Sequence, residues 1–139
     1  MQTLRTLVLA ATLVAGTLGT PARAASGDPL LVNLSSDDKH RVEMGIGFGV
    51  KQLELGHPLT IFLNDRSVQL ASSEYAPKFR KQQKLLAAAI DRGATVLVCP
   101  GCMEHFGVKE ADLLPGVKPS SPAVVEAVLF KPNTRTMSW

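Results

Sequence analysis

Short, largely apolar runs alternate along the chain with longer segments in which apolar residues recur every three or four positions. The runs at residues 30–34, 59–63 and 95–98 have the length and composition of buried strands. The periodic segments that follow the first two runs end at Gly56 and Gly93, where a left-handed glycine commonly terminates a helix. Strands that alternate with helices predict an α/β fold whose sheet is mostly parallel.

The rest of the chain predicts further elements in the same order. We expect a helix at residues 78–92, a short helix at 100–106, a brief strand within 113–118 and a final strand at 134–139. Ser121 and Pro122 are typical of a helix N-terminus and should begin the last helix. The predicted architecture therefore has three layers, with helices on both faces of a five-stranded sheet.

The first predicted helix contains two local features. Ser36 or Asp37 should cap its N-terminus. Its glycines do not have the G-x-G-x-x-G spacing of a nucleotide-binding loop and lie well past the strand. Because glycine is unfavourable inside a helix, Gly45, Gly47 and Gly49 predict a close contact with a neighbouring element.

Residues 1–24 have the features of a secretory signal peptide. Arg5 precedes an apolar stretch, and a small-x-small cleavage site follows at residues 22–24. Cleavage would leave a flexible lead-in at residues 25–29 and a single domain at residues 30–139. We therefore expect an exported protein that resides in the periplasm.

Composition narrows the class of protein. With 139 residues, of which 45% are hydrophobic and 19% charged, the chain has the size of one domain and should fold compactly. The formal charge of +3 includes two arginines of the N-terminal segment, which argues against a basic nucleic-acid-binding surface. No apolar stretch long enough to span a bilayer follows that segment. Two cysteines are too few for the disulfide framework of a small secreted domain.

Candidate chemistry lies at the carboxyl ends of the predicted strands, where parallel sheets form their binding sites. These positions hold serines 35–36 after the first strand, Asn64 and Asp65 after the second, and Cys99 after the third. Asn64 and Asp65 either line this site or simply form a turn. We expect a short extended stretch at residues 68–71 after that turn.

Cys99 and Cys102 form the most specific chemical motif. Cys99 ends a strand and precedes Pro100, so that it faces the unpaired N–H groups and dipole of a helix N-terminus, which favour a thiolate. Cys102 follows one helical turn later, within reach of Cys99. The pair predicts an attacking and a resolving thiol, in sulfur transfer or redox exchange. Two buried thiols, or an inert disulfide formed on export, are the structural alternatives.

Other sites use the same cysteine spacing. A thioredoxin fold would place the motif after an early strand and usually behind a tryptophan, whereas here it follows the third strand and the single tryptophan is Trp139. Attachment of haem c requires histidine directly after the second cysteine, where this chain has Met103. A binding site for Cu(I) or Zn remains an alternative, with Cys99, Cys102, Met103 and His105 as its ligands.

The histidines leave two interpretations open. His105 is either a base or positive neighbour of the thiolates, or a helix residue that points to solvent. His40 and His57 are expected on the surface. The residues predict no cofactor.

The order and spacing of these motifs resemble the DsrE/DsrF/DsrH-like, TusD-related sulfur relay family. The resemblance covers residues 30–139 and is carried by ELGH at 54–57, LTIFLND at 59–65, RGATVLVCPGCMEHFGV at 92–108 and the alternating terminal strand. It implies a five-stranded α/β fold, a homo-oligomer (trimer or hexamer), and sulfur transfer through a cysteine persulfide. In sulfur-carrying members the active cysteine stands eight residues before the glycine that follows the short helix, which corresponds here to Cys99 before Gly107.

Two features distinguish this chain from the cytoplasmic relay subunits, namely its predicted export and its second cysteine. We therefore expect a sulfurtransferase-type carrier that holds sulfane sulfur on Cys99, with Cys102 as the resolving thiol. Its partners would be a donor or acceptor protein or a small sulfur compound. The alternatives are a thiol-disulfide or peroxide-reducing protein, a soft-metal binding module, and a structural oligomer with an inert disulfide.

Overall fold

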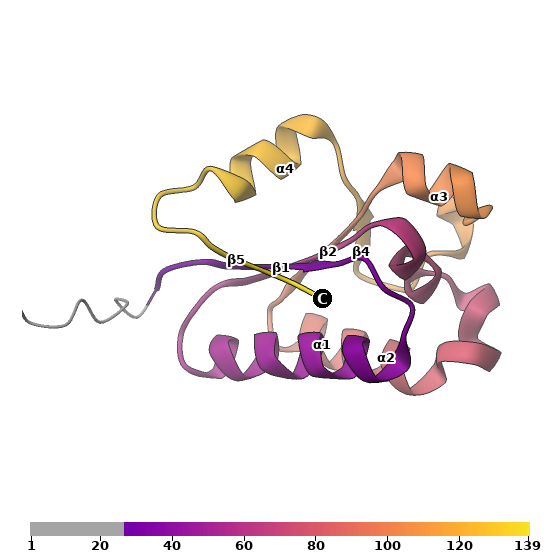
Figure 1. The fold of residues 1–139 in the computed structure, drawn as a ribbon, viewed down its shortest axis with the longest axis horizontal. Coiled ribbons are helices and arrows are strands. Elements are labelled where there is room, and N and C mark those ends of the chain that lie inside the picture. The colour runs from indigo at the N-terminus through magenta and orange to yellow at the C-terminus, as the bar shows by residue number, and fades with distance from the viewer. Residues whose placement is uncertain (1–26) are drawn as a thin grey trace, which may run out of the picture.

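The computed structural model describes residues 27–139, which form a five-stranded sheet between two layers of helices (Figure 1). The predicted signal peptide lies outside the described residues. The strands are β1 (Leu30–Leu34), β2 (Leu59–Leu63), β3 (Thr95–Val98), β4 (Val117–Pro119) and β5 (Arg135–Ser138). All neighbouring strands are parallel, in the order β4-β3-β2-β1-β5. The predicted α/β class and the five-stranded sheet are confirmed.

Helices cover both faces of this sheet, as the sequence predicted. In Figure 1, α1 (Lys39–Glu54) and α2 (Ala76–Asp91) lie below the sheet, and α3 (Pro100–Phe106) and α4 (Pro122–Leu129) lie above it. We refer to these two sides as the α1/α2 face and the α3/α4 face. The connections contain three 3₁₀ helices, η1 (Asp65–Ala71), η2 (Ser73–Tyr75) and η3 (Glu110–Asp112).

The main hydrophobic core lies on the α1/α2 face. Val32 and Ile61 are fully buried there and belong to the same cluster as Leu86 of α2. Because side chains alternate along a strand, Leu31 and Leu97 point to the opposite face, where they are buried but lie outside this cluster. Burial on both faces explains why the strands read as nearly continuous apolar runs.

Helix α1 approaches the sheet closely at two of its glycines. A Cβ atom at Gly45 would lie 2.8 Å from Cδ2 of Leu34, and one at Gly49 would lie 3.0 Å from a leucine methyl group of β2. Gly47 is exposed, and a Cβ atom there would meet no atom within 4 Å. The predicted close contact is therefore confirmed for Gly45 and Gly49 and wrong for Gly47.

The cap of α1 differs from the prediction. Asp38 is the N-cap, and its carboxylate accepts a hydrogen bond from the N–H of Arg41 at 2.8 Å. Ser36 instead accepts from the N–H of Asp38 at 3.0 Å and so orients the capping residue. The Asp37 carboxylate forms an ion pair with Lys78. Three consecutive residues had the right chemistry for a cap, and their contacts decide which one performs it.

The segment after β2 is a helix rather than a turn followed by an extended stretch. Asp65 has a left-handed φ of 49° and begins η1, which runs to Ala71. The buried Ser67 hydroxyl donates to the carbonyl of Leu34, at 2.6 Å, and approaches the carbonyl of Asn64 at 2.8 Å. This contact with the end of β1 comes from a distant part of the chain, so local sequence did not predict it.

The remaining boundaries are close to the predictions. α2 begins at Ala76, two residues earlier than expected, with Pro77 in its first turn. β4 extends to Pro119, one residue beyond the predicted range, and is only three residues long. The Ser121 cap is confirmed, since its hydroxyl accepts from the N–H of Val124 at 3.3 Å.

Candidate functional site

The carboxyl ends of three strands meet at one edge of the sheet. The N–H of Asn64, just after β2, donates to the carbonyl of Leu34 in β1 at 3.0 Å. The N–H of Cys99, just after β3, donates to the carbonyl of Leu63 in β2 at 2.9 Å. The predicted clustering of these positions is therefore present in the fold.

Cys99 lies at the junction of β3 and α3. It is the N-cap residue of α3, with Pro100 in the first turn, and its carbonyl accepts from the N–H of Met103 at 2.9 Å. Its extended backbone conformation (φ −74°, ψ 115°) ends the strand and starts the helix. The side chain does not cap the helix, and the residue is half-buried.

Cys102 is the second free cysteine and lies one turn further along α3. Burial raises the pKa of the Cys102 thiol, and a hydrogen bond with the Cys99 side chain raises it further. The backbone N–H of Asp65 opposes this shift, while the negative charge of the Asp65 carboxylate adds to it. Cys102 therefore holds its proton more firmly than an ordinary cysteine.

The two accessory residues after β2 have different surroundings. Asp65 is exposed, has a left-handed backbone, and lies near enough to Cys102 to influence the pKa of its thiol. Asn64 turns away, and its side-chain amide donates to Oδ1 of Asn33 in β1. The structure thus places Asp65 beside the thiols, whereas Asn64 links two strands.

Asn33 and Ser138 were not identified from the sequence. The amide of Asn33 donates to the hydroxyl of Ser138 at 3.4 Å, so that polar side chains from β5, β1 and the end of β2 form a continuous row. This row lies on the α3/α4 face, at the edge that also carries Cys99. An asparagine inside an apolar run was the available signal, since a polar residue is unusual in a strand buried on both faces.

The serines after β1 have structural roles. The hydroxyl of Ser35 donates to the carbonyl of Trp139 at 3.2 Å, and Ser36 orients the α1 cap. These contacts hold the C-terminus and the start of α1 in place. Among the described residues, neither serine forms a hydrogen bond with Cys99 or Cys102.

The four ligands of the alternative metal site have unequal surroundings. Met103 is buried and belongs to the hydrophobic core, whereas His105 is exposed and stacks edge-on against Phe106, with ring centroids 4.7 Å apart. Within residues 27–139, no group of three or more His, Cys, Asp and Glu side chains is placed to hold a metal ion. The described residues therefore offer two neighbouring thiols rather than a converged ligand set.

The other histidines differ from each other. His40 is exposed, as expected. His57 is half-buried, and its Nδ1 lies 2.9 Å from the carbonyl oxygen of Asp28, so the expected surface position holds only in part. It follows α1 and precedes β2, at the opposite edge of the sheet from the cysteines.

A family model described as DsrE/DsrF-like matches residues 30–130. The chain belongs to the DsrE/DsrF-like family. An uncharacterized protein of Methanocaldococcus jannaschii is 36% identical to it over 81 residues, which cover 58% of this chain and 71% of that protein.

Solved structures have the same fold as this DsrE/DsrF-like chain. The ychN protein from E. coli superposes with a TM-score of 0.69 at 14% identity, covering 81% of this chain and 99% of that one. A protein of unknown function from Methanobacterium thermoautotrophicum superposes with a TM-score of 0.63 at 18% identity, covering 80% and 98%. At these identities the similarity establishes the fold.

None of the helices within residues 27–139 of this DsrE/DsrF-like chain combines the length and apolarity that a membrane span requires.

Proposed function

We propose that this DsrE/DsrF-like protein carries sulfane sulfur as a persulfide on Cys99 and that Cys102 resolves it. One observation carries the proposal: two free thiols, one helical turn apart and close enough for Cys99 to raise the pKa of Cys102, lie at the carboxyl edge of a parallel sheet. Membership of a family with a sulfur-relay-type fold favours sulfur as the cargo.

The first step is attack by the Cys99 thiolate on the sulfane sulfur of a small donor such as thiosulfate. An S–S bond forms at Cys99, the S–S bond of the donor breaks, and sulfite leaves with the bonding electron pair. The incomplete burial of Cys99 supports this step because a fully buried cysteine could not meet a small donor. The raised pKa of Cys102 supports it too, because a protonated neighbour donates a hydrogen bond to the attacking sulfur instead of repelling it.

The second step is attack by Cys102 on the inner sulfur of the persulfide. A Cys99–Cys102 disulfide forms, and the outer sulfur leaves as hydrosulfide with the proton that Cys102 had held. The sulfane sulfur is reduced and the two thiols are oxidised, so two electrons from a dithiol reductant must restore the starting state. When an acceptor thiol reaches the persulfide first, sulfur is transferred and no disulfide forms.

The proposed compartment is the periplasm. Residues 1–24 carry the sequence features of a secretory signal peptide. In an oxidising compartment the cysteine pair would alternate between dithiol and disulfide, whereas a cytoplasmic carrier would remain reduced. The second cysteine is therefore consistent with export.

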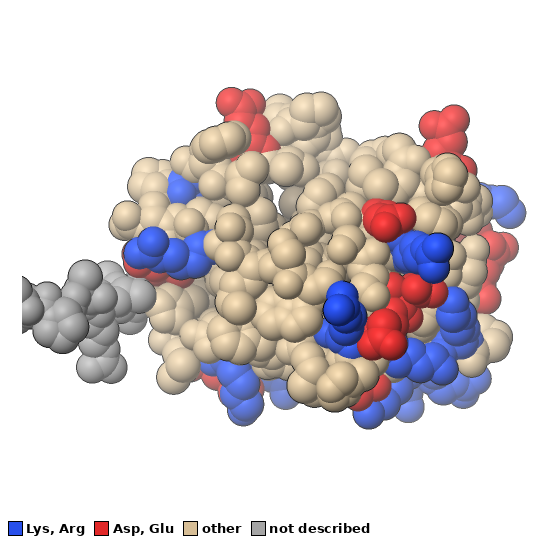
Figure 2. Space-filling model, viewed as in Figure 1, with Lys and Arg blue, Asp and Glu red and all other residues tan. Residues whose placement is uncertain are grey.

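We also propose that the protein self-associates through α4, as a trimer or hexamer. None of the residues of α4 is buried. Only one of them, Glu126, is charged, so the exposed side chains of this helix are mostly apolar. Val124 and Leu129 are 42% and 38% exposed, and the neighbouring Phe130 is 76% exposed. Figure 2 shows mostly uncharged residues over α4, whereas Lys, Arg, Asp and Glu gather at the lower right of the view. A second copy would cover this apolar surface.

Light scattering tests self-association. The wild-type protein should have the mass of a trimer or hexamer, and Leu129→Glu should shift it toward the monomer. Leu55→Glu is the matched control, because Leu55 is 67% exposed but follows α1, away from α4. A monomeric wild type, or equal effects of the two variants, would contradict the proposal.

The sulfur chemistry is tested by intact mass and released sulfide. The reduced mature protein is exposed to thiosulfate or polysulfide, and mass and hydrosulfide are measured together. Loss of about 2 Da with one equivalent of hydrosulfide is expected, because formation of the disulfide follows persulfidation. Loss of about 2 Da without hydrosulfide would indicate oxidation alone.

A thiol-disulfide or peroxide-reducing protein is the second candidate. The spacing of the two free thiols, one helical turn apart, favours it, because such a pair can close a disulfide without any sulfur donor. Replacement of Cys102 by Ser separates the candidates. Sulfur loading on Cys99 should survive this replacement, whereas disulfide cycling should be lost.

A further inference from the structure

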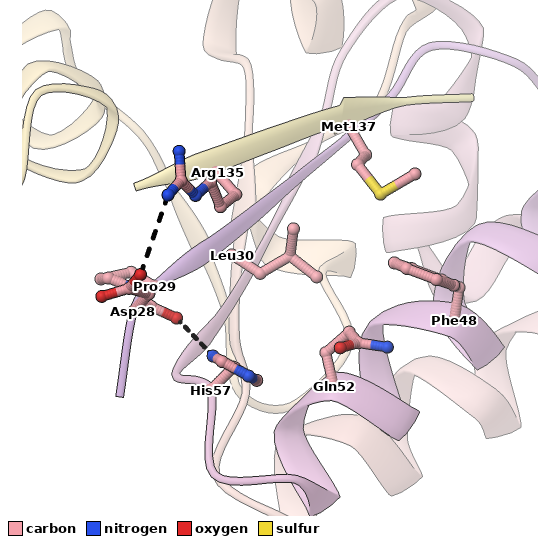
Figure 3. A pocket seen from close by; sticks show the side chains of 8 residues that line it. All are labelled: Asp28, Pro29, Leu30, Phe48, Gln52, His57, Arg135 and Met137. Carbon is pink, nitrogen blue, oxygen red and sulfur yellow. Dashed lines mark hydrogen bonds and ion pairs between the residues drawn. The ribbon is translucent and has the colours of Figure 1, made fainter. Parts of the chain in front are cut away.

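A cavity lies at the amino edge of the sheet, opposite the cysteines (Figure 3). Its volume is about 190 Å³, and it is bounded by the starts of β1 and β5, the last turns of α1 and the turn before β2. Because the strands are parallel, their starts and their carboxyl ends lie at opposite edges, one strand length of roughly 16 Å apart. The cavity therefore belongs to no part of the thiol site.

One end of the cavity is apolar. Leu30 lies at its centre in Figure 3, with Phe48 of α1 and Met137 of β5 on the right. Leu30 is only 6% exposed, whereas Phe48 and Met137 are each 38% exposed. A thioether and an aromatic ring side by side form a surface on which a flat aromatic ring packs well.

The other end is polar and electrically balanced. Arg135 and Asp28 lie on the left in Figure 3, with their charged groups 4.0 Å apart. The Asp28 side chain is 12% exposed, so its negative charge compensates the guanidinium within the wall of the cavity. This end therefore favours a neutral polar group over a carboxylate, which Asp28 would repel.

His57 supplies a hydrogen-bond acceptor of fixed orientation. A carbonyl oxygen only accepts, so the 2.9 Å contact with Asp28 places the proton of the neutral ring on Nδ1 and leaves a lone pair on Nε2. From that contact the ring extends toward Gln52 (Figure 3), and the backbone N–H of His57 donates to the backbone carbonyl of Gln52 at 3.1 Å. The Gln52 side-chain amide also lines the cavity and can donate.

We propose that this cavity binds a small, neutral aromatic alcohol of the phenol class. Its ring would pack against Phe48, Met137 and Leu30, while its hydroxyl would donate to Nε2 of His57 and accept from the Gln52 amide. The size fits, because an engineered apolar cavity of about 150 Å³ holds benzene. His57 and Gln52 both line the cavity, and together they offer the acceptor and the donor that one hydroxyl group can use.

The test compares three probes that differ in one substituent: p-cresol, toluene and p-toluate. Each is titrated into the full mature protein with labelled methionine methyl groups, in mildly alkaline buffer, where imidazole rings are generally neutral. p-Cresol should shift the Met137 methyl resonance and bind about five-fold tighter than toluene, as one or two neutral hydrogen bonds allow. p-Toluate should bind more weakly than p-cresol.

Variants assign the hydroxyl contact. His57→Phe should remove the preference for p-cresol over toluene, whereas His40→Phe, at an exposed position of α1, should retain it. If His57→Phe does not fold, Gln52→Leu tests the same contact and should reduce the preference at least two-fold. Equal binding of p-cresol and toluene to the wild type, tighter binding of p-toluate, or no shift at Met137 would overturn the proposal.

Discussion

The two faces of the sheet differ in how completely their helices are buried. On the α1/α2 face, both helices contribute fully buried residues to the core, including Val42 and Leu86. On the α3/α4 face, α4 has no buried residue and α3 contributes only Met103. The difference indicates that the α1/α2 face supplies most of the buried core, while the α3/α4 face carries the thiols and leaves apolar side chains exposed.

The largest contrast should appear in a matched pair of leucine truncations. Leu86 in α2 is 0% exposed and Leu129 in α4 is 38% exposed. Leu86→Ala should lower the free energy of unfolding by about 2–5 kcal/mol, because it leaves a cavity in a packed core. Leu129→Ala should lower the free energy of unfolding of the isolated chain by less than about 1 kcal/mol.

Urea unfolding at several protein concentrations measures both effects. Any additional loss for Leu129→Ala should depend on concentration, because it would report lost association. Equal losses of unfolding free energy in the two variants, independent of protein concentration, would contradict the difference between the two faces.

A second matched pair tests the close contact of α1 with the sheet. Gly45→Ala should be destabilising by up to about 2 kcal/mol, because overpacking against Leu34 exceeds the gain in helix propensity. Gly47→Ala should be stabilising by about 0.5–1 kcal/mol, since its Cβ meets no atom within 4 Å. Thermal unfolding of the two variants is the measurement. A stabilised Gly45→Ala variant would show that the contact between α1 and the sheet has room for a methyl group, contrary to this packing.

The α3/α4 face can be probed through the Cys102 thiol. Because burial and Cys99 raise its pKa, Cys102 should remain protonated at a pH where an ordinary cysteine has begun to ionise. Iodoacetamide at about pH 8.5, the usual cysteine pKa, should modify it several-fold more slowly than a cysteine in an unstructured peptide. The pH at half-maximal rate should lie above that of the peptide, and a midpoint at or below the peptide value would contradict the arrangement of the two thiols.

The smallest effect is expected for an ion pair at the α1/α2 face. The hydrogen bond from Lys78 lowers the pKa of Asp37, so the pair stabilises the folded state above the unfolded-state pKa and this stabilisation is lost as the pH falls. Lys78→Ala should be destabilising by less than about 1 kcal/mol at pH 7, because the pair is solvent-exposed.

This loss should disappear as Asp37 is protonated, between about pH 5 and pH 2. Lys84→Ala serves as the control, because Lys84 forms no ion pair within the described part of the chain. A loss for Lys78→Ala that persists unchanged in acid would assign the effect to packing against Phe79 instead.

Local sequence predicted the regular elements well because their signals are local. The strands at 30–34, 59–63 and 95–98 have their predicted bounds, and the glycines after α1 and α2 have the expected positive φ. The helix η1 could not be predicted in this way, because Ser67 is held by the carbonyl of Leu34, which lies 33 positions earlier.

The site was predicted only in part for the same reason. The C-x-x-C spacing was sufficient to place Cys99 and Cys102 on one helical turn. The row from Ser138 through Asn33 to Asn64 depends on strand order, which brings β5 beside β1 across 105 positions. The burial of His57 likewise depends on a contact with Asp28, at the far end of the preceding strand and helix.

The most direct test of the central claim compares Cys99→Ser and Cys102→Ser after exposure of the reduced proteins to polysulfide. Each variant keeps one thiol, so the intact mass assigns the carrier without fragmentation. We predict that Cys102→Ser gains about 32 Da, one sulfur atom, and loses it to cyanide, whereas Cys99→Ser remains unmodified. Sulfur uptake by Cys99→Ser, or none by Cys102→Ser, would contradict the assignment of Cys99 as the sulfur carrier.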